Sequence, residues 1–128
     1  MSTFSAGIDL PPVAHSVPLA RHVTVDLLRV WRAPHDRDDA ALLVTELVSN
    51  VVDHVGGEAS FTLELELADG WLRMAVVDGS SVLPVVRELN SAHPRGRGLR
   101  LVQAIAERWG CESQDGGKRI WFDLAPPV

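Results

Sequence analysis

The chain has a single cysteine and no tyrosine, and only 5% of its residues are aromatic. One thiol, at Cys111, excludes an intrachain disulfide and fits a reducing compartment. No apolar run approaches the roughly 18 residues that a membrane-spanning helix needs. Residues 1–10 lack the basic and apolar regions of a secretion signal. We therefore expect a cytoplasmic protein that does not enter a membrane.

Basic residues are also few, since 12 Lys and Arg stand against 17 Asp and Glu, for a net charge of −5 at pH 7. This balance argues against a general electrostatic hold on nucleic acid. The 128 residues, 46% of them hydrophobic, suffice for one domain with its own core. We expect a flexible segment over 1–15, with a short edge strand as the alternative, and a domain over 16–125.

Apolar residues at helical spacing predict two helices in the first half of the chain. The first spans about 18–31, with Ser16 as its cap. Its expected inner stripe is Leu19, Val23, Leu27 and Val30. The second begins near 35–38, where acidic residues suit the positive end of the helix dipole, and it ends near 55.

The second half contains strands in adjacent pairs. The expected strands, with turns at 68–70 and 115–117 between the members of each pair, are 61–67, 71–77, 111–114 and 118–124. A long segment rich in turn residues, 78–95, and a third helix over about 98–109 separate the two pairs. This order predicts an α+β two-layer sandwich, in which a largely antiparallel sheet has its helices on one face.

A polar stripe interrupts the apolar second helix. Glu46, Asn50 and His54 recur at four-residue intervals, so they share one side of the helix, with Asp53 beside them. If the stripe is buried, a bound metal with a polyphosphate would satisfy it, because Asn offers oxygen to a hard cation and Glu can deprotonate a nucleophile. The alternative is the wet face of an amphipathic helix.

Two further segments suit a ligand. Asp78 ends an apolar strand, where its carboxylate can accept an N–H group from a ligand or form an Asx turn with Gly79. Gly96 and Gly98 precede the third helix, where glycine allows close backbone approach and a helix start attracts anions. The arginines of this stretch favour a phosphate-bearing ligand, the alternative being a solvated turn; they are Arg87, Arg95, Arg97 and Arg100.

Other site motifs are missing from the sequence. There is no P-loop, no His-Glu-x-x-His and no nucleophile elbow, and the five histidines are too scattered to indicate a zinc site. Gly116-Gly117-Lys118 is interpreted as part of a hairpin turn.

In this order, the segments resemble the GHKL (histidine kinase-like) ATPase superfamily, and more closely the small bacterial anti-sigma-factor serine/threonine kinases and their stand-alone ATP-binding relatives. Residues 46–54 (ELVSNVVDH) are similar to the N box, 76–84 (VVDGSSVLP) to the first glycine box, and 96–102 (GRGLRLV) to the second. Residues 117–124 resemble the last strand of the family. The resemblance implies a Bergerat-type ATP-binding fold, with a mixed, mostly antiparallel sheet and three helices on one face.

The resemblance also implies ATP and Mg²⁺ as ligands. Asn50 would bind the metal, Glu46 would be the general base, and Asp78 would bind the adenine amino group. The other residues expected at the nucleotide are Asp53, His54, Gly79, Ser81, Leu83, Arg95, Gly96, Arg97, Gly98 and Leu99. Segment 78–95 would include the lid of the site.

The implied function is phosphorylation of an anti-sigma antagonist together with binding of a sigma factor, and a homodimer is compatible with it. The alternative is a non-catalytic switch that binds its partner with or without nucleotide. Two departures from the family pattern bear on this choice. Ser81 stands where a second glycine is usual, and His93-Pro94-Arg95 replaces a more acidic lead-in. ATP binding is therefore better supported than catalysis.

Overall fold

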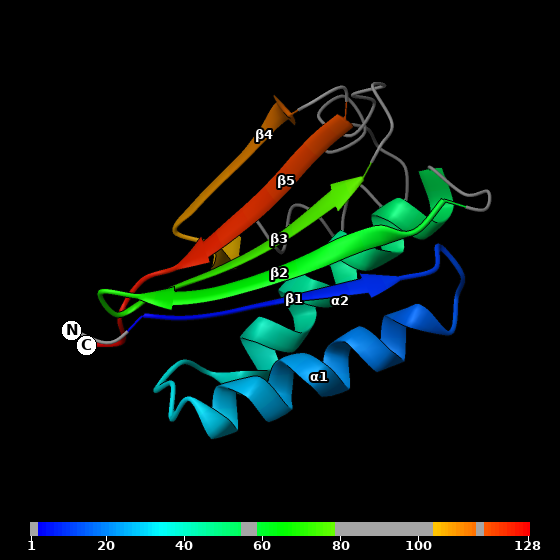
Figure 1. Ribbon diagram of the computed structural model, residues 1–128. Coiled ribbons are helices and arrows are strands. Elements are labelled where there is room, and N and C mark those ends of the chain that lie inside the picture. Colours follow the sequence, from blue (N-terminus) through cyan, green and yellow to red (C-terminus); the bar gives the residue numbers. More distant parts are fainter. Residues whose placement is uncertain (1–2, 55–58, 79–103, 115–116) are drawn as a thin grey trace.

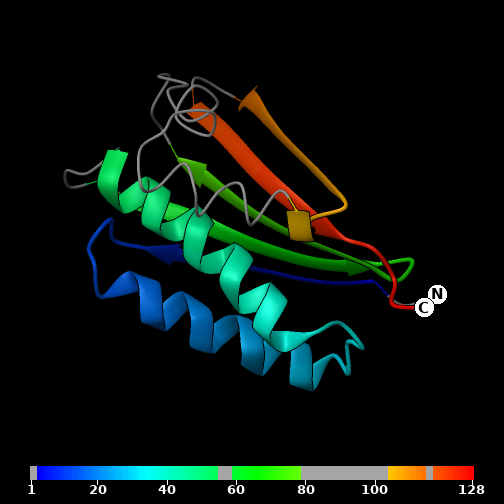
Figure 2. The ribbon, with the colours of Figure 1, turned by 180° about the vertical axis from the view of Figure 1, so that it is seen from behind.

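A computed structural model describes residues 3–54, 59–78, 104–114 and 117–128, and the backbone alone at 54 and 114. Its strands are β1 (Phe4–Leu10), β2 (Phe61–Ala68), β3 (Trp71–Asp78), β4 (Arg108–Gln114) and β5 (Gly117–Leu124). Its helices are α1 (Ser16–Val30) and α2 (Arg37–His54). Both helices lie on one face of the sheet (Figures 1 and 2), which confirms the two-layer α+β arrangement.

The sheet has the strand order β1-β2-β3-β5-β4, and every pair of neighbours among these described strands is antiparallel. The mixed sheet implied by the resemblance is therefore wrong for this part of the chain. Strand β1 forms one edge by pairing with β2. The edge strand, rather than a fully flexible segment, is thus what the structure shows over Phe4–Leu10.

The predicted third helix differs most from the structure. Residues 98–103 lie outside the described residues, and only 104–105 are helical in the described remainder. Arg108 already begins β4, so the prediction of a helix as far as Trp109 is wrong. Ile105, Ala106 and Trp109 also fit a helical stripe, which explains the error. Gly117 likewise belongs to β5 and not to the turn.

Helix α2 supplies the centre of the core. Its apolar side chains that are at most 2% exposed are Ala40, Leu43, Val44, Leu47, Val48 and Val51. They pack with the apolar face of β3 and β5, which presents Leu72, Met74, Val76, Ile120 and Phe122. A polar side chain on this side of α2 therefore lies within or beside the core.

Helix α1 is rotated relative to its predicted stripe. Its buried residues are Ser16, Ala20, Thr24 and Leu28, whereas Leu19 is 44% exposed and Val30 is 74% exposed. The search for large apolar residues failed because three of these four buried residues are small or carry a hydroxyl, and only Leu28 is large and apolar. Their hydroxyl groups are satisfied locally, since Thr24 Oγ1 donates to the Ala20 carbonyl at 2.8 Å.

The helix caps also differ from expectation. Ser16 is the first helical residue, and its Oγ donates to the Pro11 carbonyl at 2.6 Å, so the predicted cap is wrong. The clear cap belongs to α2, where Asp36 Oδ1 accepts the backbone N–H of Asp39 at 2.9 Å.

Gly110 allows β4 to pass close to a large ring. A Cβ atom there would lie 2.6 Å from Cζ2 of Trp121. Because the Trp121 ring also stacks on the Arg73 guanidinium, 4.1 Å from its centroid, the ring has little freedom to move.

Gly110→Ala should therefore lower the free energy of unfolding by about 1–3 kcal/mol in urea titrations. In the control Gly7→Ala, the new Cβ would meet only Thr62 Cγ2 at 3.8 Å, so a change within about 0.5 kcal/mol is expected. Equal stability of the two variants would contradict this packing.

Candidate functional site

The polar stripe of α2 enters the protein interior. Asn50 is only 4% exposed, and Glu46, one turn earlier, is half-buried with a polar contact of its own. The alternative of a solvated helix face is therefore wrong for Asn50. Asp53 is exposed, and His54 is the last residue of α2. The interior part of the stripe is thus an amide and a carboxylate, one helical turn apart.

Asp78 lies on the same side of the sheet as α2. Side chains of β3 alternate between the two faces, and Leu72, Met74 and Val76 face the core. Asp78 continues this series at the end of the strand and is 5% exposed. Because α2 packs against β3, the sheet face that carries Asp78 is also the face covered by the Glu46–Asn50 helix (Figure 2).

A buried lysine accompanies Asp78. Lys118 of β5 stands opposite Asp78 in the register of the two strands, and its side chain is 2% exposed. Its Nζ lies 4.0 Å from Oδ2 of Asp78, which makes an ion pair in the interior. Sequence reasoning placed Lys118 in the expected strand 118–124 but did not identify it as a site residue. The signal was available, since Lys118 begins a strand whose alternate positions, Ile120 and Phe122, are both core residues.

These side chains fit an adenine nucleotide with magnesium. Asp78 provides a buried acceptor for an exocyclic amine, and Asn50 provides a buried amide oxygen. Mg²⁺ typically keeps several waters and is held by one or two protein oxygens plus substrate phosphates. The described residues contain no group of three His, Cys, Asp or Glu side chains that could hold a metal.

The remaining predicted nucleotide contacts lie outside the described residues. They are Gly79, Ser81, Leu83, Arg95, Gly96, Arg97, Gly98 and Leu99.

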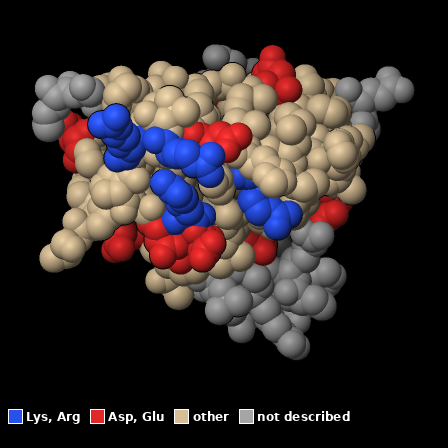
Figure 3. Space-filling model, turned by 90° about the horizontal axis from the view of Figure 1, so that it is seen from below, with Lys and Arg blue, Asp and Glu red and all other residues tan. Residues whose placement is uncertain are grey.

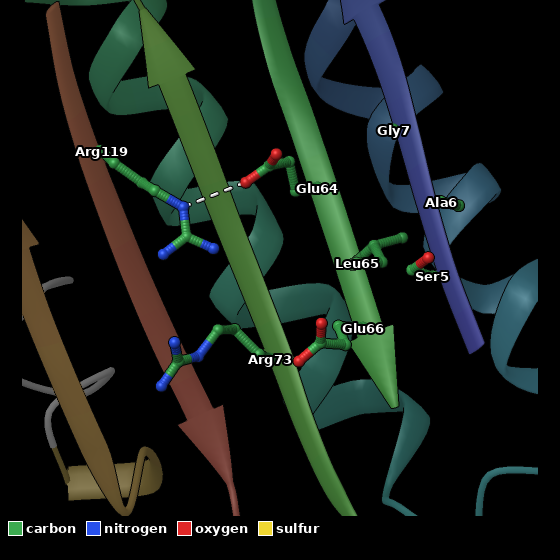
Figure 4. A pocket seen from close by; sticks show the side chains of 8 residues that line it. All are labelled: Ser5, Ala6, Gly7, Glu64, Leu65, Glu66, Arg73 and Arg119. Carbon is green, nitrogen blue, oxygen red and sulfur yellow. Dashed lines mark hydrogen bonds and ion pairs between the residues drawn. The ribbon is translucent and has the colours of Figure 1, made fainter. Parts of the chain in front are cut away.

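The opposite face of the sheet carries ion pairs. Asp123 accepts two hydrogen bonds from Arg73, at 2.7 and 2.9 Å, and a third contact of 3.0 Å from Arg108. Arg119 donates to Glu64 at 3.0 Å (Figure 4). A groove of about 310 Å³ runs between these residues and β1. It lies on the face away from Asn50 and Asp78, and two of its charged residues, Arg119 and Glu64, are paired with each other, so we do not assign the nucleotide to it.

The exposed charges are mixed in sign. On the face seen in Figure 3, Lys and Arg side chains gather near the middle and Asp and Glu side chains border them. This face does not offer the continuous basic surface that nucleic-acid binding needs.

A buried histidine marks the start of α2. His35 is 5% exposed, and within the described part of the chain neither of its ring nitrogens makes a hydrogen bond. Burial lowers the pKa of His35 below its ordinary value, and backbone groups of Gly70, Ala125 and Leu124 offset only part of this effect. Asp36, Asp39 and Glu107 line the same cavity of about 190 Å³.

His35 should make the protein less stable in mild acid. The unfolded chain takes up a proton at about pH 6.5 while the folded chain still resists it, so stability falls as the pH drops below that value. His35→Gln should remove this slope, which is at most about 1.4 kcal/mol per pH unit for one proton. Urea unfolding between about pH 7.5 and 5.5 measures it, and His22→Gln on the exposed side of α1 is the control. If the free energy of unfolding of His35→Gln depends on pH as in the wild type, His35 is not the cause of the loss of stability in acid.

Comparison with known families identifies the fold. A family model described as the histidine kinase-like ATPase domain matches residues 10–124. The chain therefore belongs to the histidine kinase-like ATPase (GHKL) family, which confirms the resemblance carried by its three motifs.

Two known proteins are similar to this chain, one in sequence and one in fold. The uncharacterized protein SCO4941 of Streptomyces coelicolor is 31% identical over 90 residues, covering 66% of this chain and 86% of that protein. The crystal structure of the RsbU and RsbW domains of Rv1364c from Mycobacterium tuberculosis matches 95% of this chain with a TM-score of 0.70 and 20% identity. The match covers 32% of that chain, so this protein spans about a third of its length, and the likeness shows a shared fold.

None of the described helices is long and apolar enough to cross a membrane.

Proposed function

We propose that this protein is a cytoplasmic ATP-dependent serine/threonine kinase of the anti-sigma-factor type, which phosphorylates an anti-sigma antagonist and binds a sigma factor. The observation that carries the proposal is the burial of Asn50 together with Asp78, on a helix and a strand that pack against each other. Three findings support it: the fold shared with about a third of the Rv1364c chain that contains the RsbU and RsbW domains, the family match over residues 10–124, and the resemblance of the three motifs to those of the anti-sigma kinases.

Each described residue has a distinct task in this proposal. Asp78 accepts a hydrogen bond from the amino group of the base, and Asn50 gives one oxygen to Mg²⁺. When bound, Mg²⁺ neutralises charge on the phosphates. Glu46 accepts the proton of a serine or threonine hydroxyl as that oxygen bonds to the γ-phosphorus, and the bond from phosphorus to the β–γ bridging oxygen breaks to release ADP.

The helix places Glu46 and Asn50 for these tasks. Residues four apart on a helix lie on one side, about 5–6 Å between Cβ atoms, so a base and a metal ligand can serve the same phosphoryl group. Glu46 is half-buried and takes part in a polar interaction, so it is not a freely solvated surface residue.

The test combines binding with phosphoryl transfer. Calorimetry with ATP, with and without Mg²⁺, measures nucleotide binding, and incubation with labelled ATP and purified candidate antagonists measures transfer. We expect Mg²⁺-dependent binding and labelling of a serine or threonine in an antagonist. Binding without labelling of any antagonist encoded nearby would favour the non-catalytic switch, to which the Ser81 departure also points. Absence of ATP binding would overturn the proposal.

A further inference from the structure

The buried lysine of β5 has no evident role in building the sheet. Lys118 is 1% exposed, and the next two residues on its side of β5, Ile120 and Phe122, are apolar core residues. Removing an ammonium group from water is costly, and replacing a buried ion pair by neutral residues of similar volume is often neutral or stabilising. The Asp78–Lys118 pair is therefore better explained by what Asp78 does than by stability.

We propose that Lys118 is a positioning residue of the nucleotide site: its ammonium group keeps the Asp78 carboxylate ionised and oriented to accept an N–H from the base, and so makes the site prefer a 6-amino purine over a 6-oxo purine. This inference rests on the proposed function, because it assigns the base specificity of the same site.

The separation of the two groups suits this role. The distance of 4.0 Å between Nζ of Lys118 and Oδ2 of Asp78 is that of an ion pair and is too long for a hydrogen bond. Through this contact, Lys118 favours the charged carboxylate without occupying a lone pair of Oδ2. A carboxylate has about four acceptor sites in all, so Asp78 can accept from a ligand in addition to its ion pair with Lys118.

The charge state of Asp78 determines which base it recognises. An ionised carboxylate only accepts hydrogen bonds, which matches the amino group at position 6 of adenine. A protonated carboxyl also donates, which matches the oxygen at position 6 of hypoxanthine. Burial alone favours the neutral form of a carboxyl, and a nearby cation favours the charged form. Without Lys118, the site should therefore distinguish these two bases poorly.

The only cysteine of the chain lies close enough to report on this pair. Cys111 of β4 is half-buried, and it pairs with Ile120 two residues after Lys118. Burial raises the pKa of Cys111, while Lys118 opposes that shift and Asp78 adds to it. The rate at which Cys111 reacts with a thiol reagent therefore offers a measure of how far nucleotide occupies the site, and this measure does not depend on catalysis.

The experiment compares ATP with inosine triphosphate (ITP) by calorimetry. Wild-type protein should bind ATP about tenfold or more tightly than ITP, since a site that matches an amino group leaves a polar group unsatisfied with the oxo analogue. In Lys118→Met, this ratio should fall to about 1–3, whereas Lys118→Arg, which keeps the charge, should keep most of it. ATP should protect Cys111 of the wild type from the thiol reagent. In Lys118→Met, this protection should weaken together with the preference for ATP.

A matched control separates positioning from folding. Arg119→Met changes the next residue of β5, whose side chain lies on the opposite face and contacts Glu64, and it should keep the wild-type ratio. Equal loss of ATP and ITP affinity in Lys118→Met would mean that Lys118 is merely structural and would overturn the inference, as would an unchanged ratio. If Lys118→Met does not fold, Lys118→Gln, which removes the charge but keeps a polar end on a side chain one atom shorter, should show the same loss of preference.

The two proposals fail differently. A wild-type protein that binds neither nucleotide refutes the proposed function and this inference with it. A wild-type protein that prefers ATP, with the preference intact in Lys118→Met or Lys118→Gln, refutes the inference alone.

Discussion

Replacing Glu46 by Gln should slow phosphoryl transfer to the antagonist about 100-fold or more, because Gln cannot accept the hydroxyl proton of the substrate. Affinity for ATP should change by no more than about threefold, since the amide has nearly the same shape and the role of Glu46 lies in the chemical step. Single-turnover transfer of labelled phosphate, together with calorimetry for ATP, measures the two quantities separately.

The control for Glu46→Gln is the same chemical change elsewhere on α2. Asp38 is exposed in the first turn of the helix, and Asp38→Asn removes a charge there without touching the interior. Its transfer rate should match the wild type. If Glu46→Gln retains the wild-type rate, Glu46 is not the base. If it loses ATP affinity and rate by the same factor, Glu46 acts in binding instead.

Sequence patterns predicted the layers of the fold because apolar burial dominates its elements. Helix α2 was predicted within two residues at its start and one at its end, since its long apolar pattern has clear flanking signals. Strands β2 and β3 followed from alternation and an Asp-Gly turn, and both were confirmed to within one residue. The N box lies on α2 and the first glycine box begins at the end of β3, so for these two elements the physical pattern and the resemblance agree.

The predictions failed where small or polar residues form the packed surface. Helix α1 packs through Leu28 and through Ser16, Ala20 and Thr24, and a search for large apolar residues passes over the last three. Strand β4 was shortened because Ile105 to Trp109 also fits a helical period. Neither error reflects weak packing. In each case the sequence pattern fits two arrangements, and the tertiary contacts determine which of them forms.

The candidate site was predicted in part for a similar reason. Asn50 and Asp78 were found because a polar residue in an apolar element is conspicuous, and their burial now supports their selection. Lys118 was overlooked because its partner is 40 positions away in the sequence. Only the register of β3 and β5 brings the two charges together. Pairings of this kind depend on strand order, which adjacency in the sequence does not reveal.

Asn50→Ala should remove most of the effect of Mg²⁺ on nucleotide binding. Wild-type protein should bind ATP more tightly with Mg²⁺ than without it, because Asn50 contributes an oxygen to the metal–phosphate complex. In Asn50→Ala, affinity with Mg²⁺ should fall about tenfold, while affinity in a chelator should stay within about threefold of the wild type. Calorimetry under both conditions gives the four affinities that define this coupling.

The neighbouring residue provides the control, since Ser49→Ala also truncates a half-buried polar side chain on α2 and should preserve the Mg²⁺ effect. Asn50 is buried, so its loss also lowers stability, and thermal unfolding must show that both variants are folded at the temperature of the titration. A uniform loss of affinity with and without Mg²⁺ would assign Asn50 to packing. Because a structural defect weakens both states alike, only a loss confined to the Mg²⁺ state identifies Asn50 as the metal ligand.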